Sequence, residues 1–367
     1  MSKVKLSKIA EIQAGPFGTQ LHKNEYVTDG IIMLNAKNIG NGEILLDDID
    51  CVSEKVCNRL PMYILREGDI LFGRAGSIER HTYVSDEYAG SFQGTNCIRI
   101  RCKSIEEAIY VSYYLWLPQV KKLIENKTGG SVLSYITTDL LKEILIELPN
   151  KNTILSIDTL LYTIDEKRRL NCKINDNLTA MAYDIYMHTF FSKKPNGRLK
   201  DILVEADKSS VQVGEAKQST GEYPFFTSGS AILKWDTPFI DGRNCFLNTG
   251  GNADVKFYVG KAAYSTDTWC ISANNDMADY LYLLLVSIKP ELNQKFFQGT
   301  GLKHLQKPLL KDRPIYIPDF EELKIFNKQV NPMFNIISEN TRENQELIIL
   351  RDWLLPMLMN GQATIAD

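Results

Sequence analysis

Apolar residues recur along the chain with two different spacings. Short runs rich in β-branched and aromatic residues, bounded by Gly, Asn and Asp, predict β-strands in both halves. Examples are residues 30–34 and 68–73 in the first half and 245–248 and 256–259 in the second. Two longer apolar segments, 105–124 and 277–297, predict helices that break at the internal prolines Pro118 and Pro290.

A near 3.5-residue apolar spacing follows the dipeptides Leu148-Pro149 and Ile317-Pro318. It predicts two helices of roughly 35 to 40 residues, about 50 to 60 Å long at 1.5 Å per residue. From these dipeptides onward the two stretches match at a constant separation of 169 residues. The matched apolar pairs are Ile154 with Leu323, Ile157 with Phe326, Leu161 with Val330, Ile164 with Met333, Leu178 with Leu347, Met181 with Leu350, and Ile185 with Leu354.

Polar residues interrupt this apolar seam at Arg168, Asn171 and Asn340. A buried polar residue can fix the register of paired helices, but a polar gap on a solvated helix face gives the same pattern. We expect the two helices to pair antiparallel, which hides both apolar stripes. The predicted pairing residues are Ile157, Leu161, Ile164, Asn171, Leu178, Met181, Ile185, Phe326, Val330, Met333, Asn340, Leu347, Leu350 and Leu354.

The length of 367 residues suits about two domains, and the second half repeats the first. Residues 5–12 resemble residues 198–205, so each segment is expected to open a domain. The predicted fold class is α+β, with two similar mixed domains, each followed by a long helix, and the helices forming an antiparallel coiled-coil pair. The expected divisions are 1–149 and 193–318 for the domains, 150–192 and 319–360 for the helices, and 361–367 for a C-terminal tail.

Composition narrows the function classes. The chain is 44% hydrophobic and 24% charged, which is typical of a globular protein. It has no apolar run of about 20 residues and no signal-peptide pattern at its start, so a cytoplasmic location is expected. Seven cysteines without a CxxC pair and four histidines without ligand spacing predict no metal site. No catalytic motif is present, and no catalytic residue is expected.

Several short stretches resemble the specificity subunits of type I restriction-modification systems, and the resemblance covers nearly the whole chain. The stretches are residues 5–10 (KLSKIA), 66–71 (REGDIL), 223–229 (YPFFTSG) and 248–253 (NTGGNA), together with the Leu-Pro or Ile-Pro step before each long helix. The resemblance implies two target-recognition domains, each reading one half of a split double-stranded DNA site. It also implies that this subunit performs no chemistry.

The same resemblance implies the partners and cofactors. Two methyltransferase subunits are expected to bind the chain, together with a motor-nuclease restriction subunit. S-adenosylmethionine, ATP and magnesium are expected on those partners and no cofactor on this chain. No membrane contact is expected.

Candidate DNA-binding residues in the first half fall in two places. If residues 98–103 form a strand, its period of two places Arg99, Arg101 and Lys103 on one face, where they could meet phosphate. The turn-rich loop 73–81 carries two arginines able to form bidentate contacts with guanine. Its candidates are Arg74, Ser77, Arg80 and His81. An ordinary half-exposed strand and a turn that merely needs glycine remain the alternatives.

Glycine-containing loops supply the other candidates, because a backbone without side-chain obstruction can present N–H groups to phosphate. Simple helix termination by glycine is the alternative. These candidates are Gly129, Gly130 and Ser131 in the first half and Lys303 and His304 in the second. Asn248, Asn252 and Lys256 are candidates because the placement of loop 248–256 resembles that of loop 73–81, and a turn that merely needs glycine is again the alternative.

The net charge of -3 and the pI near 5.9 are not typical of a nucleic-acid-binding protein. If the chain binds DNA, its cations must therefore be concentrated on one surface. A tandem-domain scaffold that binds proteins and never DNA is the competing interpretation. A weaker third is a metal-dependent nuclease using carboxylates such as Asp69 and Glu79.

Overall fold

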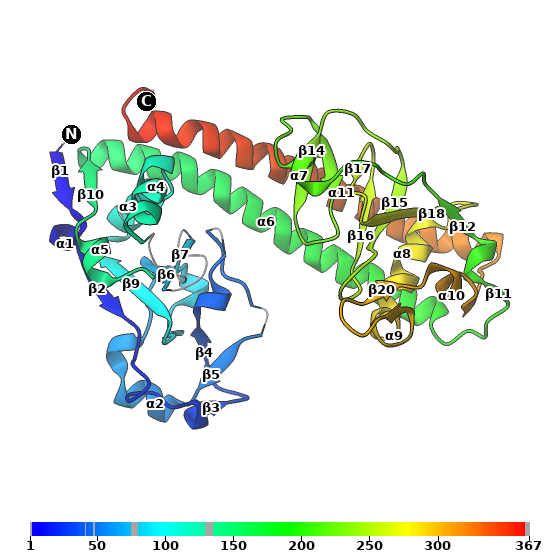
Figure 1. The fold of residues 1–367 in the computed structure, drawn as a ribbon, viewed down its shortest axis with the longest axis horizontal. Coiled ribbons are helices and arrows are strands. Elements are labelled where there is room, and N and C mark those ends of the chain that lie inside the picture. Colours follow the sequence, from blue (N-terminus) through cyan, green and yellow to red (C-terminus); the bar gives the residue numbers. More distant parts are fainter. Residues whose placement is uncertain (1, 41, 47, 75–79, 129–134, 364–367) are drawn as a thin grey trace. The chain divides into compact units, whose positions relative to one another are not determined.

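The computed structural model describes residues 2–40, 42–46, 48–74, 80–128 and 135–363 (Figure 1). The chain divides into two compact units. Unit 1 contains Met1–Glu166 and Ile349–Asp367, and unit 2 contains Lys167–Ile348. Within the described ranges, every helix is too short or too polar to cross a membrane.

Unit 1 is built on two four-stranded sheets with the orders β2-β9-β6-β7 and β3-β5-β4-β8, plus the antiparallel pair β1 and β10. Pro118 begins α4, as the sequence predicts, because a proline fits the first turn of a helix but not its interior. The strands are β1 (Ser2–Lys5), β2 (Ala10–Ala14), β3 (Tyr26–Val27), β4 (Ile31–Leu34), β5 (Asp50–Val52), β6 (Asp69–Gly73), β7 (His81–Tyr83), β8 (Phe92–Gln93), β9 (Cys97–Cys102) and β10 (Leu145–Leu148). The helices are α1 (Leu6–Ile9), α2 (Glu54–Arg59), α3 (Ile105–Leu115), α4 (Pro118–Thr128) and α5 (Thr138–Lys142), with short turns η1 (Lys23–Glu25), η2 (Ala36–Asn38), η3 (Pro61–Tyr63) and η4 (Asp86–Tyr88).

Unit 2 has a four-stranded sheet of order β12-β18-β15-β16 and a three-stranded sheet of order β14-β13-β17. The predicted break at Pro290 is also present, since α8 ends before it and a separate turn, α9, contains it. The strands are β11 (Gly197–Arg198), β12 (Leu203–Glu205), β13 (Tyr223–Phe226), β14 (Ile232–Trp235), β15 (Arg243–Asn248), β16 (Val255–Val259), β17 (Ala263–Tyr264), β18 (Thr268–Ala273), β19 (Phe297–Gln298), β20 (His304–Leu305) and β21 (Pro314–Ile315). The helices are η5 (Leu199–Asp201), α7 (Val213–Ala216), α8 (Ala278–Ser287), α9 (Lys289–Glu291), η6 (Leu292–Phe296) and α10 (Lys307–Lys311).

The two units repeat one topology, which confirms the internal repeat. In each unit an outer strand pairs with a long strand, and two strands from earlier in the chain follow it in the sheet. The order β2-β9-β6-β7 therefore corresponds to β12-β18-β15-β16. The parallel pair β4 and β8 corresponds to the parallel pair β13 and β17. The strand registers therefore give residue equivalences, such as Phe72 opposite Ile98 in unit 1 and Leu247 opposite Trp269 in unit 2.

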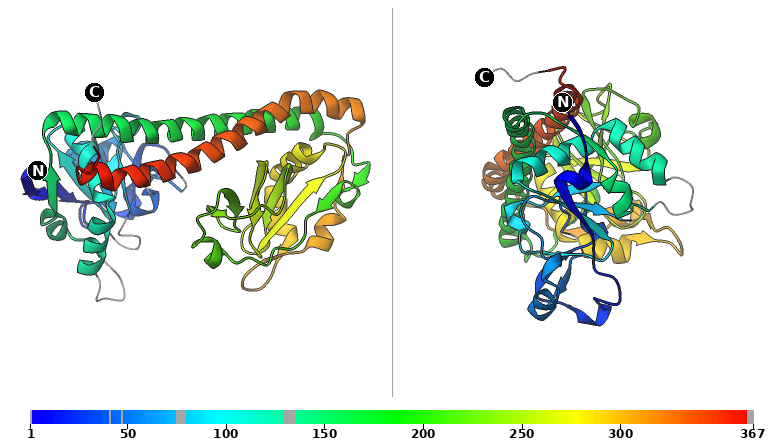
Figure 2. Two further views of the ribbon diagram at one scale, coloured as in Figure 1. Left: turned by 90° about the horizontal axis from the view of Figure 1, so that it is seen from above. Right: turned by 90° about the vertical axis from the view of Figure 1, so that its left-hand side faces the viewer.

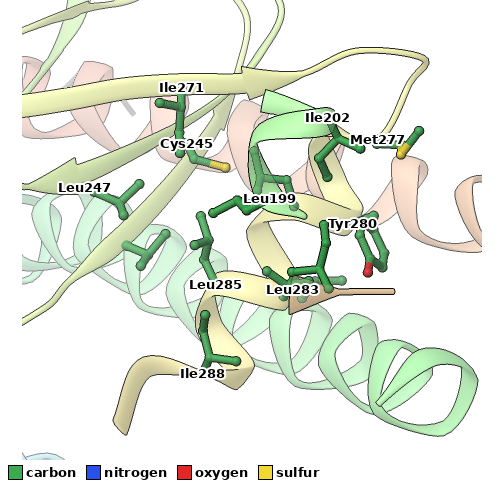
Figure 3. Packing of buried hydrophobic residues seen from close by; sticks show 14 of the residues in the cluster. Leu199, Ile202, Cys245, Leu247, Ile271, Met277, Tyr280, Leu283, Leu285 and Ile288 are labelled. Atoms are coloured by element: carbon green, nitrogen blue, oxygen red, sulfur yellow. The ribbon is translucent and has the colours of Figure 1, made fainter. Parts of the chain in front are cut away.

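Each unit has its own core, to which the long helices contribute. In unit 1, Ile157 and Leu161 pack with the sheet residues Ile70 and Ile100. In unit 2, strand residues such as Cys245 and Leu247 face Leu283 and Leu285 (Figure 3). The ends of both long helices thus fold as part of the globular cores. Each fully buried aliphatic side chain of this kind stabilises the fold by roughly 1.5–3 kcal/mol.

The two long helices are α6 (Lys151–Phe190) and α11 (Phe320–Met359), and within each unit they run side by side and antiparallel (Figure 2). In unit 2 the Asn171 Nδ2 donates to Glu343 Oε2 at 2.8 Å, and the Asn340 Nδ2 donates to Asn175 Oδ1 at 2.8 Å. Residue numbers rise along one helix as they fall along the other, which confirms the predicted orientation. Asn171 is buried and bonded across the pair, so it is a buried polar residue of the seam rather than a gap on a solvated face.

The prediction that Met181 and Leu350 are buried between the paired helices is wrong, because Met181 is 52% exposed and Leu350 is 42% exposed. Near Met181 the buried face of α6 is set by Ala182 and Tyr186, which enter the core of unit 2, and Leu355 does the same for α11 in unit 1. Packing against the globular cores therefore decides which face of each helix is buried at these positions. That face differs from the one predicted from helix pairing alone. The other apolar pairing residues are buried or half-buried: Ile157, Leu161, Ile164, Leu178, Ile185, Phe326, Val330, Met333, Leu347 and Leu354.

Candidate nucleic-acid interface

In unit 1 the fold joins the two loops that the sequence singled out separately. Arg74, directly after β6, donates its backbone N–H to the Asn96 carbonyl at 2.8 Å. Its own carbonyl accepts the backbone N–H of Ile136 at 3.1 Å. The residue that follows β6 is therefore fixed to Ile136, which lies just before α5. The candidates Ser77, Gly129, Gly130 and Ser131 lie outside the described residues.

The equivalent two loops of unit 2 are joined by the same backbone bonds. Thr249, directly after β15, donates to the Asp267 carbonyl at 3.0 Å and accepts from the Leu305 N–H at 2.9 Å. A third bond runs from the Gly251 N–H to the Lys303 carbonyl at 2.9 Å. Gly251 has a φ of +85°, a conformation that favours glycine, so this glycine does permit a turn as well as the bond. Each unit thus has one pair of joined segments, which we call the paired loops: Arg74 with Ile136 in unit 1, and residues 248–252 with 299–304 in unit 2.

Different side chains occupy the two sets of paired loops. In unit 2, Asn252, Leu302, Lys303 and His304 are exposed. In unit 1, Arg74 is half-buried, and among the described residues nothing accepts a hydrogen bond from its Nε. Arg80 is also half-buried. One backbone frame therefore carries a cation at Arg74 where the other carries the neutral Thr249.

The expected basic face of β9 is present but is not exposed. Arg99 is 1% exposed, donating to Glu11 Oε1 at 2.7 Å and to the Met62 carbonyl at 2.7 Å. Arg101 forms a bidentate pair with the fully buried Asp69, with distances of 2.7 and 2.6 Å. Only Lys103 is exposed. The prediction of a solvent-facing stripe is wrong for Arg99 and Arg101, because the segment 62–64 and the Asp69 carboxylate cover that face.

His81 is also inside the protein rather than on the loop surface. Its ring is fully buried between Phe72, at 4.7 Å between centroids, and Trp116, at 4.2 Å. One ring nitrogen lies 2.9 Å from the Ser112 carbonyl. Burial lowers the pKa of His81 to about 3, so the ring is neutral at physiological pH. The expectation that it faces DNA is wrong, since β7 turns it into the core.

Two candidates in unit 2 have their polar atoms engaged within the protein. Asn248 is buried and its Nδ2 donates to the carbonyls of Gly250 at 2.7 Å and Asn252 at 2.6 Å, which closes the turn. Lys256 donates to the carbonyls of Thr227, at 2.8 Å, and Gly229. Burial lowers the pKa of Lys256. Asn248 thus shapes the paired loops from within, whereas Lys256 is bonded to the segment 227–229. Both findings correct the expectation that these residues are presented to DNA.

Asp69, one of the two carboxylates named for a metal-dependent nuclease, is not available to bind a metal ion. Asp69 accepts two hydrogen bonds from Arg101 and one from the Arg66 N–H at 2.8 Å, so its lone pairs are committed to the fold. Glu79 lies outside the described residues. Within the described part of the chain, no group of three His, Cys, Asp or Glu side chains is arranged to hold a metal ion.

The fold and the paired loops define a tandem recognition protein whose two units share one frame and differ in the side chains they present. Residues 1–180 and 193–347 match the model of the type I restriction modification DNA specificity domain, and the chain belongs to that family. As a specificity subunit, it is the non-catalytic part of a type I restriction-modification system and serves DNA target recognition. Subunits of this kind assemble with methyltransferase and restriction subunits.

Individual relatives agree with this membership. The chain is 21% identical to the MjaIX specificity subunit of Methanocaldococcus jannaschii, over 99% of this chain and 93% of the relative. It is 24% identical to the EcoDI specificity subunit of Escherichia coli over 41% of this chain and 34% of that protein. Its fold is similar to the crystal structure of the S subunit from M. genitalium, with a TM-score of 0.60 and 16% identity, covering 97% of this chain and 95% of the other.

Proposed function

We propose that each unit reads one half of a bipartite double-stranded DNA target through its paired loops, and that the chain directs two methyltransferase subunits and a restriction subunit to that target. The observation that carries this is the shared backbone frame around Arg74 and Thr249, which presents different side chains in the two units. Side chains on a rigid frame are the usual means of base readout. S-adenosylmethionine, ATP and magnesium belong, in this proposal, to the partner subunits.

The experiment that tests DNA binding is a salt titration. The full chain assembled with methyltransferase subunits should bind duplex DNA with an affinity that falls steeply as salt rises, because neutralising phosphates releases counterions. For six to ten phosphate contacts the loss is roughly 10³–10⁵ between 50 and 200 mM salt. Binding that is absent, or independent of salt, would leave the protein-scaffold alternative in its place.

We predict that Arg74→Ala weakens binding to the methylation target by about 1–3 kcal/mol through loss of a bidentate base contact. The change should alter only the half-site read by unit 1. Arg74→Lys should not restore specificity, because an ammonium lacks the planar fork of the guanidinium. Arg80→Ala tests the other arginine of the same loop.

The matched control is Thr249→Ala, which changes the equivalent position in unit 2. Mapping methylated sites for each variant should show relaxed bases in different half-sites for Arg74 and Thr249. Relaxation of the same half-site in both variants, or in neither, contradicts the assignment of one half-site to each unit.

The methyltransferase contact is proposed for α11, where an apolar face lies exposed in unit 1. Ile349 and Trp353 are four residues apart and therefore share a face, and they are 50% and 60% exposed. A large exposed aromatic flanked by aliphatic side chains is typical of a protein interface.

We predict that Trp353→Ala weakens assembly with the methyltransferase subunit by about 2 kcal/mol or more, since buried tryptophans are frequent energetic centres of interfaces. Analytical ultracentrifugation of the mixed subunits measures this. Tyr135→Ala removes another exposed aromatic of unit 1 and should leave assembly unchanged. Equal effects of the two substitutions would show that Trp353 has no special role.

A further inference from the structure

Two lysines lie over a buried tryptophan in unit 2, and a third lysine is a neighbour of one of them. Lys307 and Lys311 lie one helical turn apart on α10, with their Nζ atoms 4.9 and 5.9 Å from the centroid of the Trp269 ring. Lys208, in the segment after β12, is close enough to Lys307 to affect its titration. We call these three residues the lysine cluster.

The fold neutralises only part of this charge. The Glu205 carboxylate accepts from Lys311 Nζ and from Trp269 Nε1, the latter at 2.8 Å. Among the described residues, no carboxylate forms an ion pair with Lys307 or Lys208. Burial lowers the pKa of Lys307, and the neighbouring Lys311 and Lys208 act in the same direction, while Glu205 opposes them. Lys307 and Lys311 thus share the Glu205 carboxylate while Lys208 adds a further positive charge beside Lys307, an arrangement that a bound anion would relieve.

The cluster adjoins the paired loops of unit 2 along the chain. Strand β20 ends at Leu305, whose N–H is bonded to Thr249, and α10 begins at Lys307. The exposed Lys303 and His304 precede it directly. Phosphates flank the bases that a recognition loop reads, so cations next to such loops are placed to bind the backbone and set the register of the protein on the duplex.

Unit 1 has no counterpart of the cluster at the equivalent described positions. The strand registers place Ile98 where unit 2 has Trp269 and Ile12 where it has Glu205. Counting back 169 residues, α5 has Thr138 in place of Lys307, and Lys142, in place of Lys311, forms an ion pair with Asp139 at 2.9 Å. The shared fold therefore does not require Lys307, and its presence in unit 2 calls for a different reason.

We propose that Lys208, Lys307 and Lys311 form a phosphodiester-binding site that holds the backbone of duplex DNA beside the bases read by unit 2. This inference rests on the proposed function and adds to it a site that reads no sequence. Trp269 and Glu205 position the cluster: the ring lies under two of the ammonium groups, and the carboxylate holds Lys311 in place. Lys307 and Lys208 supply the cations available to phosphate.

The test is the salt dependence of binding to random-sequence duplex DNA, measured by fluorescence anisotropy with the full chain assembled with methyltransferase subunits. Lys208→Met with Lys307→Met keeps the apolar stems that pack on the protein and removes both charges. The slope of log affinity against log salt should fall by about 1 to 2, since each phosphate contact contributes about 0.9. Affinity for the methylation target should fall by the same factor as affinity for random DNA.

Lys324→Met and Lys142→Met are the matched controls. Lys324 is an exposed lysine over an aromatic ring on α11, and Lys142 is the unit 1 equivalent of Lys311. Both should retain the wild-type slope. Thermal unfolding of each variant shows whether unit 2 remains folded, and Lys307→Arg should keep the slope because it keeps the charge.

A second measurement does not depend on folding of a variant. Acetylation of Lys307 in the wild-type complex should be slowed by random duplex DNA, because phosphate would cover the amine. An unchanged slope in the double variant, a loss confined to the methylation target, or unprotected Lys307 overturns this proposal. If the wild-type complex itself shows no salt-dependent DNA binding, the proposed function fails as well, and the two failures are thereby distinguished.

Discussion

Arg101→Ala should destabilise unit 1 by about 3–5 kcal/mol, the effect of leaving a buried carboxylate without its counter-charge. Asp69 is fully buried, and both its oxygens accept from Arg101. The hydrogen bonds to Asp69 raise the pKa of Arg101. Urea unfolding followed by tryptophan fluorescence and calorimetry measures the change.

Lys103→Ala is the matched control, since it removes an exposed cation two residues further along the same segment. It should change the free energy of unfolding by no more than about 0.5 kcal/mol. Replacing both partners, with Arg101→Met and Asp69→Leu, should recover part of the loss, because two apolar groups leave no unpaired charge. If Arg101→Ala instead left stability unchanged and weakened DNA binding, Arg101 would be a phosphate contact and its pairing with Asp69 dispensable.

Lengthening both long helices by four residues should lengthen the unread spacer between the two half-sites by one or two base pairs. Four residues add about 6 Å and nearly one full turn, which preserves the apolar faces. At 3.4 Å per base pair this corresponds to one or two pairs. The insertions belong after Arg168 in α6 and after Leu347 in α11.

The contacts within each unit explain why both helices must change. Asp165 pairs with Arg351 at 3.1 Å in unit 1, and Asn171 bonds to Glu343 at 2.8 Å in unit 2. Matched insertions keep both contacts, whereas an insertion in α6 alone can keep only one of them. The single insertion is therefore expected to lower stability.

Mapping methylated sites of the assembled enzyme provides the measurement. The half-site bases should stay the same while the spacer grows. Altered half-site bases with an unchanged spacer would show that the helices do not set the distance between the two reading surfaces.

The amino-acid sequence by itself determined the repeat, the strand and helix classes, the breaks at Pro118 and Pro290, and the two long helices. These features depend on local periodicity and on the restricted backbone of proline, which are legible without tertiary contacts. Local periodicity did not determine every buried position of the two long helices. Asn171 and Asn340 were identified from the seam, but Met181 and Leu350 are exposed because the globular cores also select the buried face.

Only the tertiary structure decided which cations are available to DNA. A period of two places Arg99 and Arg101 on one face of a strand, but it carries no information on what covers that face. Here the segment 62–64 and the Asp69 carboxylate cover it, so both arginines stabilise the fold. The junction of Arg74 with Ile136, and the gathering of lysines around Trp269, join segments that are far apart in sequence. Such contacts are set by the packing of the whole unit, which is why local pattern did not reveal them.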